Sequence, residues 1–153
     1  TLNNIASCHL YLGEAQEGLE TGGRALRIWN DLSTEESPVL LHCTLGDLYL
    51  AVAQGDEADK HFRFAVKNTP ADAFAHPYAL LGLARRYALA GERAKAERYA
   101  AHALELSVAH GFRFTEGLAQ LVSAQLSGAD APLREAERVF SEIGARRELT
   151  QVY

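Results

Sequence analysis

Methionine is absent from this 153-residue chain, and cysteine occurs only twice, as Cys8 and Cys43. Two cysteines are too few for a disulfide framework, so we expect a reducing compartment, the cytoplasm. No apolar run reaches the roughly 18 residues of a membrane span, because the run that begins at Pro77 ends at Arg85. The first residues also lack the basic start and apolar stretch of a signal peptide.

An excess of positive charge is missing as well. The chain has 15 lysines and arginines against 20 aspartates and glutamates, which gives a formal net charge of −5. A protein that binds a phosphate backbone needs a basic surface to displace counterions, and anionic membranes attract basic segments. We therefore expect no nucleic-acid partner and no membrane partner.

No stretch of six residues alternates strictly between apolar and polar side chains, so strands are hard to place. Helix-forming residues dominate instead, chiefly alanine, leucine, glutamate and arginine. The prolines fit helix ends: Pro38, Pro77 and Pro132 lie near helix starts, and Pro70 ends a helix. The sequence predicts helices over 1–12, 15–31, 37–54, 56–68, 74–90, 93–110, 114–127, 131–143 and 145–153, with a polar loop at 33–37.

A pattern of small residues returns along the chain. Its copies begin at Gly18, Ala58, Ala96 and Ala136, which are 40, 38 and 40 residues apart. A period of this length is typical of solenoids, in which each unit buries its apolar face by stacking on its neighbours.

Glycines between paired helices predict tight turns. We expect Gly55 and Gly91 to supply the left-handed cap at the end of a first helix, with acidic residues at the start of the next helix.

Two units carry a motif of leucine, small residue and tyrosine in the first helix, followed by alanines in the second. The first-helix motifs are Leu45-Gly46-x-x-Tyr49 and Leu83-Ala84-x-x-Tyr87. The pattern resembles the tetratricopeptide repeat (TPR), in which small residues allow close helix approach. The resemblance implies an all-α, α–α superhelix of about four helical hairpins plus a partial ninth helix. The first unit departs from the pattern, because Gly18 and Gly22 replace an alanine and a bulky residue.

The expected units are about 1–34, 35–72, 73–111 and 112–153, which together form a single repeat domain over 1–153. Units of this long period resemble those of bacterial signalling ATPases, multidomain transcriptional regulators and nucleotide cyclases. The chain starts and stops inside apparent helices, so we interpret it as a segment of a larger protein.

The sequence contains few candidates for a catalytic or metal-binding site. No nucleophile elbow, phosphate loop or dinucleotide fingerprint is present. The pairs Cys8-His9 and His42-Cys43 lack the usual spacing of zinc ligands, and His61 is expected on a solvated helix face. We therefore expect no enzyme activity, no metal and no cofactor in this segment.

The first helices of the repeats are expected to line the inner curve and bind a protein or peptide. An arginine beside aromatic side chains could hold an acidic or C-terminal group; alternatively, such arginines only pair with neighbouring glutamates. Small-effector sensing and end-to-end self-association are the other functions we consider. The candidate binding residues are Asp47, Leu50, Tyr78, Leu81, Arg85, Leu89 and Arg113.

Overall fold

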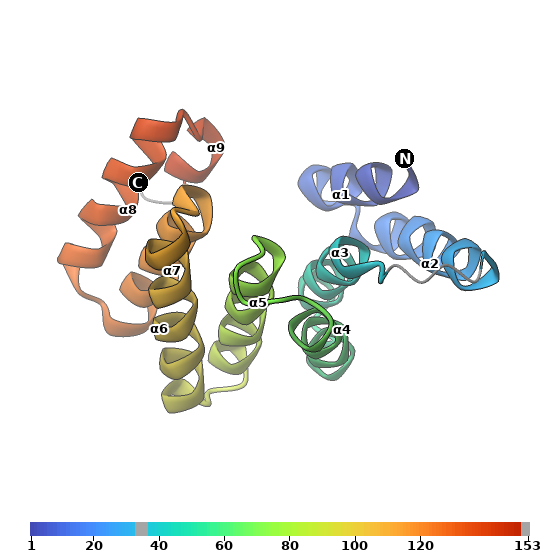
Figure 1. The fold of residues 1–153 in the computed structure, drawn as a ribbon, viewed down its shortest axis with the longest axis horizontal. Helices are drawn as coiled ribbons and strands as arrows, with labels where there is room; N and C mark the ends of the chain where they lie inside the picture. The colour runs from blue at the N-terminus through green and yellow to red at the C-terminus, as the bar shows by residue number, and fades with distance from the viewer. Residues whose placement is uncertain (33–36, 151–153) are drawn as a thin grey trace. The chain divides into compact units, whose positions relative to one another are not determined.

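The structure is a computed structural model, and it describes residues 1–32 and 37–150. These residues form nine α-helices and no strand (Figure 1), as the sequence predicts. The expected polar loop falls largely on 33–36, and the end of the ninth helix on 151–153, both outside the described residues. The helices are α1 (Leu2–Leu12), α2 (Ala15–Asp31), α3 (Val39–Ala51), α4 (Gly55–Lys67), α5 (Ala75–Leu89), α6 (Arg93–His110), α7 (Arg113–Ser127), α8 (Asp130–Ile143) and α9 (Arg146–Leu149).

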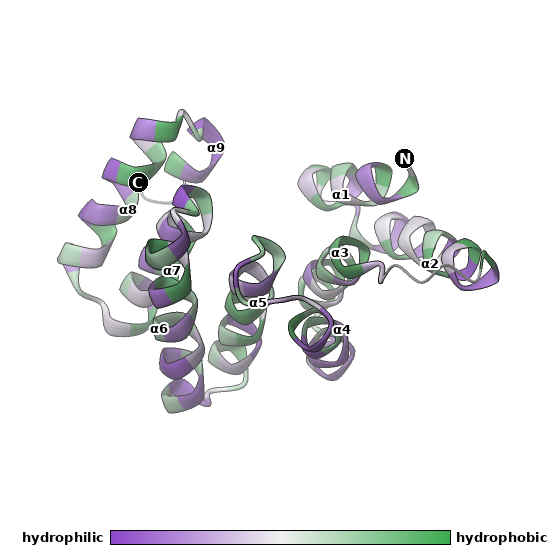
Figure 2. Cartoon of the chain, viewed as in Figure 1, coloured by the Kyte–Doolittle hydropathy of each residue, from purple (hydrophilic) through white to green (hydrophobic). Residues whose placement is uncertain are grey.

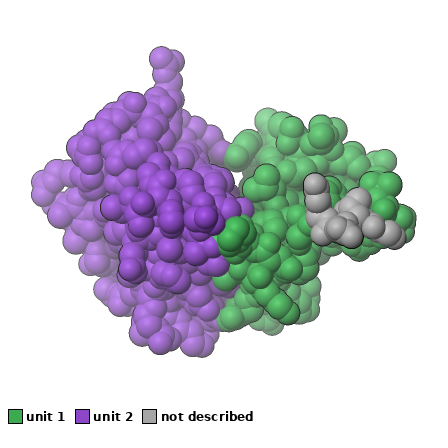
Figure 3. All heavy atoms as spheres, in the orientation of Figure 1, with its two compact units in different colours: residues 1–70 green, residues 71–153 purple. Residues whose placement is uncertain are grey.

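The chain divides into two compact units, residues 1–70 and 71–153 (Figure 3). Unit 1 contains the hairpins α1–α2 and α3–α4, and α2 packs against α3. Unit 2 contains the hairpins α5–α6 and α7–α8, and α6 packs against α7, while the short α9 packs against α8. In each unit the second helix of one hairpin therefore covers the first helix of the next, which is how repeat units share a core.

The distribution of hydrophobic residues over the helices matches this packing (Figure 2). Helix α3 is covered on several sides, and every residue from Leu41 to Leu48 is buried. Helix α8 has one covered face, with Ala136, Val139 and Phe140 buried, and shows both hydrophobic and polar colours in Figure 2. No helix of the described chain is long and apolar enough to cross a bilayer.

A residue in the left-handed backbone conformation ends the first helix of each hairpin. The third hairpin illustrates the hydrogen bonds of this turn. Gly91 has φ of 77°; its N–H donates to the carbonyl of Ala88, at 3.0 Å, and the N–H of Glu92 donates to the carbonyl of Tyr87, at 2.9 Å. This pair of bonds is the Schellman motif, which favours glycine because a Cβ is strained at positive φ. The cap predicted at Gly91 is confirmed.

The cap predicted at Gly55 is wrong. Gly55 is the first residue of α4, and the left-handed residue of this turn is Ala53, with φ of 59°. The N–H of Ala53 donates to the carbonyl of Leu50, at 3.0 Å, and the N–H of Gln54 donates to the carbonyl of Tyr49, at 2.9 Å. The turn is the same as at Gly91, but an alanine occupies its strained position.

Glycine also allows close approach inside two hairpins. A Cβ on Gly46 would lie 2.6 Å from the ring of Phe62, and a Cβ on Gly117 would lie 2.6 Å from the ring of Phe140. Real Cβ atoms do not approach other atoms so closely, so each phenylalanine occupies the space that its glycine leaves.

At the contact between α2 and α3, the glycines lie on α2, the second helix of its hairpin, and the large residues lie on α3. A Cβ on Gly18 would lie 2.5 Å from Leu48 Cδ2, and one on Gly22 would lie 2.7 Å from Leu45 Cδ2. The departures from the repeat pattern at Gly18 and Gly22 therefore have a physical reason: leucines of α3 occupy the space of the missing side chains.

Candidate functional site

In unit 1 the candidate face consists of α1 and α3. Asp47 is only 7% exposed, and Leu50 is half-buried. On the neighbouring turns, the hydroxyls of Ser7 and Thr44 lie 3.3 Å apart and join the two helices. The side chains of this face thus bind one another, and Asp47 presents little surface to a ligand.

In unit 2 the candidate residues of α5 differ in exposure. Tyr78 and Arg85 are half-buried, Leu89 is 75% exposed, and Leu81 is only 2% exposed. The expectation that all four line an open face therefore fails at Leu81, whose side chain belongs to the core. Helical periodicity placed the four residues near one side of α5, but it did not show how far the neighbouring helices cover that side.

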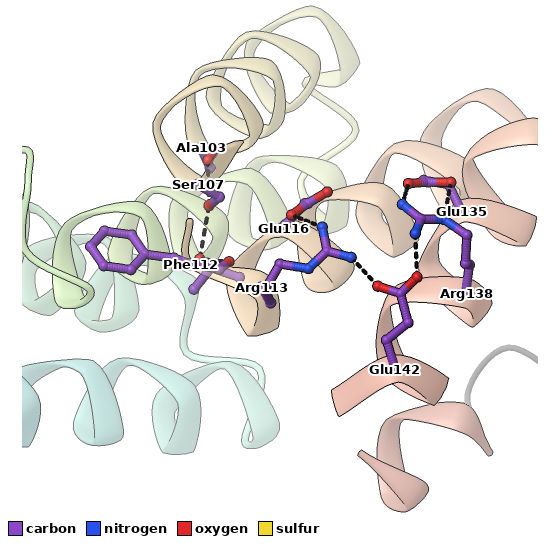
Figure 4. Close-up of polar contacts among 9 residues, drawn as sticks. Ala103, Ser107, Phe112, Arg113, Glu116, Glu135, Arg138 and Glu142 are labelled. Carbon is purple, nitrogen blue, oxygen red and sulfur yellow. Dashed lines mark hydrogen bonds and ion pairs between the residues drawn. The ribbon is translucent and has the colours of Figure 1, made fainter. Parts of the chain in front are cut away.

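Arg113, at the start of α7, is the best-defined charged residue of the candidate set (Figure 4). Its Nη1 lies 2.6 Å from Oε2 of Glu116, and its Nη2 forms an ion pair with Glu142 of α8. The hydrogen bonds that Arg113 donates to Glu142 and Glu116 raise the pKa of Arg113, and the bond it donates to Glu142 lowers the pKa of Glu142. Arg113 thus pairs with neighbouring glutamates, the alternative weighed in the sequence analysis.

The ion pairs continue along α8. Glu142 also pairs with Arg138, which in turn binds Glu135, so the network joins α7 to α8 (Figure 4). The two carboxylates that hold Arg113 differ in burial: the Glu116 side chain is 10% exposed and the Glu142 side chain 46%. Glu142 is therefore the more accessible of the two partners, and Glu116 is nearly buried.

Three phenylalanines of unit 2 were not expected as site residues, and two of them, Phe112 and Phe114, flank Arg113 in the sequence. Phe74, at the N-terminal cap of α5, is 41% exposed. Its ring centroid lies 6.0 Å from that of Tyr78, 6.1 Å from that of Phe112 and 6.5 Å from that of Phe114. We call Phe74, Tyr78, Phe112 and Phe114 the aromatic patch. The sequence contained an indication of this patch, since Phe74 and Phe112 both cap first helices and lie one repeat period apart.

Unit 1 contains a pair of histidines that the sequence did not indicate. The Nδ1 atoms of His42, in α3, and His61, in α4, lie 2.8 Å apart. The His42 ring also stacks on Phe64, with centroids 3.8 Å apart, and Tyr49 stacks on His61 at 5.3 Å. The prediction that His61 lies on a solvated face holds only in part, because its ring is half-buried and pairs with His42.

Burial lowers the pKa of His42 to about 4, and the neighbouring His61 lowers it as well. Burial also lowers the pKa of His61, against an opposing effect of Glu57. Both rings are therefore neutral near pH 7, and one Nδ1–H donates to the other Nδ1. The described residues hold no group of three or more metal-ligating side chains around this pair.

The stacked hairpins, their Schellman turns and their small-residue seams define a TPR-like repeat fold, all-α and of the α–α superhelix class. Two similar crystal structures contain nearly identical TPR-like repeats of a Podosopora anserina protein described as a kinesin light chain, one of them with a single substitution. They are 17% and 16% identical to this chain, with TM-scores of 0.67 and 0.63. Each alignment covers 99% of this chain and 83% of the other. At this identity the likeness shows the fold alone. No family model matches the sequence, and no curated protein matches it.

Proposed function

We propose that this chain is a non-enzymatic repeat domain that binds a protein or peptide on the first-helix face of unit 2. The observation that carries the proposal is the aromatic patch, which is partly exposed and two of whose members, Phe112 and Phe114, flank the positively charged Arg113 in the sequence. Aromatic residues and arginines contribute most of the binding energy at protein interfaces. The TPR-like fold of the solved neighbours supports a binding role over a catalytic one.

The patch would recognise two features of a peptide. Phe74 and Tyr78 offer apolar ring surface to a hydrophobic side chain. Arg113 would bind an acidic side chain or a C-terminal carboxylate, which takes the place of Glu142 while Glu116 stays in contact. Because the exchange replaces one ion pair with another, the apolar contact has to supply most of the affinity.

We further propose that 1–153 acts as a single cytoplasmic repeat domain within a larger bacterial signalling or regulatory protein. The long repeat period and the two free cysteines, Cys8 and Cys43, support this context.

The test is a selection from a library of random peptides with free C-termini, followed by affinity measurements on the selected peptides. Phe74→Ala should weaken binding about tenfold or more, whereas Val108→Ala, which truncates a residue 60% exposed on α6, should not. If no peptide is selected, or if the two variants behave alike, the proposal fails. A small metabolite that raises the melting temperature while no peptide binds would favour effector sensing instead.

A further inference from the structure

The outward side of α1 in unit 1 carries an apolar stripe that no helix of residues 1–32 and 37–150 covers. Ile5 is 49% exposed, Leu12 is 71% exposed, and Cys8 between them is also exposed. These residues are three and four positions apart, so they lie on one face of the helix. Residues Leu2–Leu12 include no Asp, Glu, Lys or Arg. We call Ile5, Cys8 and Leu12 the α1 stripe.

The internal repeat shows which residues of α3 correspond to this stripe. The N–H of Gly13 donates to Leu10 at 3.2 Å and the N–H of Glu14 to His9 at 2.8 Å. These are the bonds made 40 residues later by Ala53 and Gln54, so α1 and α3 end in the same way. With this offset, the α1 stripe corresponds to Leu45, Leu48 and Val52 of α3.

Two of the three corresponding residues of α3 are covered by a helix. Leu45 is 2% exposed and Leu48 is fully buried. The covering helix is α2, and the contact is close because Gly22 and Gly18, four residues apart, leave space for the two leucines. Helix α6, which packs against α7, likewise has buried small residues at Ala96, Ala100 and Ala103. Helices α2 and α6 thus both carry buried small residues three or four positions apart.

We propose that the α1 stripe is a docking surface for an amphipathic helix with glycine or alanine four residues apart, the kind of helix that α2 presents to α3. The residue opposite Ile5 must be small, since Ile5 corresponds to Leu45. The residue opposite Cys8 can be larger than glycine, because cysteine is smaller than the corresponding Leu48. The absence of formal charge on α1 means that the partner helix presents an apolar rather than a charged face.

Alkylation of Cys8 by iodoacetamide tests the proposal, because Cys8 is exposed while Cys43 is buried. The probes are two cysteine-free synthetic peptides, one spanning residues 14–32 with α2 and one spanning residues 93–110 with α6. The second is included because its alanines favour the helix in isolation. We expect at least one probe, at concentrations up to about 1 mM, to slow alkylation of Cys8 about fivefold or more.

Matched variants separate this surface from the rest of unit 1. Ile5→Glu should abolish protection of Cys8 by the probes, and Leu40→Glu, at a 58% exposed position of α3, should leave it unchanged. A probe with Gly18→Leu and Gly22→Leu should no longer protect. If neither unmodified probe protects Cys8, the proposal is wrong. If protection instead rises with protein concentration alone, a second copy occupies the stripe, and the helix proposal is overturned in favour of self-association.

Discussion

The ring of Phe62 occupies the space that a side chain at Gly46 would need: a Cβ there would lie 2.6 Å from two of its ring atoms. In the third hairpin the corresponding residues are Ala84 and Ala100, both buried. One hairpin thus combines the smallest residue with a large ring, and another uses two methyl groups. The space between the two helices of a hairpin is therefore filled by the pair of residues together and not by either residue alone.

Gly46→Ala should destabilise the protein by about 1–3 kcal/mol, because the new methyl group overpacks against Phe62. Urea denaturation measures the change. The control is Gly23→Ala in α2, where an added Cβ meets nothing closer than Arg27 Nη1 at 3.7 Å. This control should stabilise the protein by about 0.5–1 kcal/mol through helix propensity. Equal effects of the two substitutions would contradict the packing described for Gly46.

Ala53→Gly should stabilise the protein by about 1 kcal/mol, since glycine adopts the left-handed conformation without the Cβ strain that Ala53 bears. The reverse change at the equivalent turn, Gly91→Ala, should destabilise by a similar amount. Thermal unfolding of both variants provides the measurement. The account of the turns is wrong if Ala53→Gly lowers the melting temperature.

The His42–His61 pair should make stability depend on pH. The folded-state pKa of His42, about 4, is below its unfolded value of 6.5, so the unfolded chain binds the proton more readily. Its contribution to stability is therefore full above about pH 6.5 and is lost as the pH falls toward 4. We expect a loss of roughly 1–2 kcal/mol, discounted for the partial exposure of the pair.

Urea midpoints at pH 7.5 and pH 4.5 measure this dependence. The double variant His42→Leu and His61→Leu should lose stability less steeply with acid than the wild type, whereas His102→Gln, at an exposed histidine of α6, should match the wild type. An unchanged slope in the double variant would show that other groups cause the acid sensitivity.

Glu142→Gln should increase binding of peptides that carry a carboxylate by about two- to fivefold, because Arg113 then loses its exposed competitor. Arg113→Gln should reduce the same affinity and its dependence on salt. Fluorescence anisotropy with a labelled peptide selected as above gives both values. The control is Glu105→Gln on an exposed position of α6, for which no change is expected. Tighter binding in that control would point to long-range charge and not to Arg113.

The helices could be predicted from the sequence because their limits are set locally, by prolines, glycines and the spacing of apolar residues. The face of α5 was predicted only in part: Leu81 is buried because of helices that pack on it, and such contacts are not encoded in its own segment. The His42–His61 pair was missed for a similar reason, since two residues 19 positions apart meet only once the register of α3 against α4 is fixed. Phe74 and Phe112 could have been found, because they are one period apart at equivalent caps.

The most direct test of the proposed binding face is an amide chemical-shift map of the isotope-labelled protein with a selected peptide. The account predicts that the largest shift changes fall at the N-terminal ends of α5 and α7, around Phe74, Phe112 and Arg113. Changes concentrated on α6 or on the outer side of α2, with these residues unaffected, would contradict it.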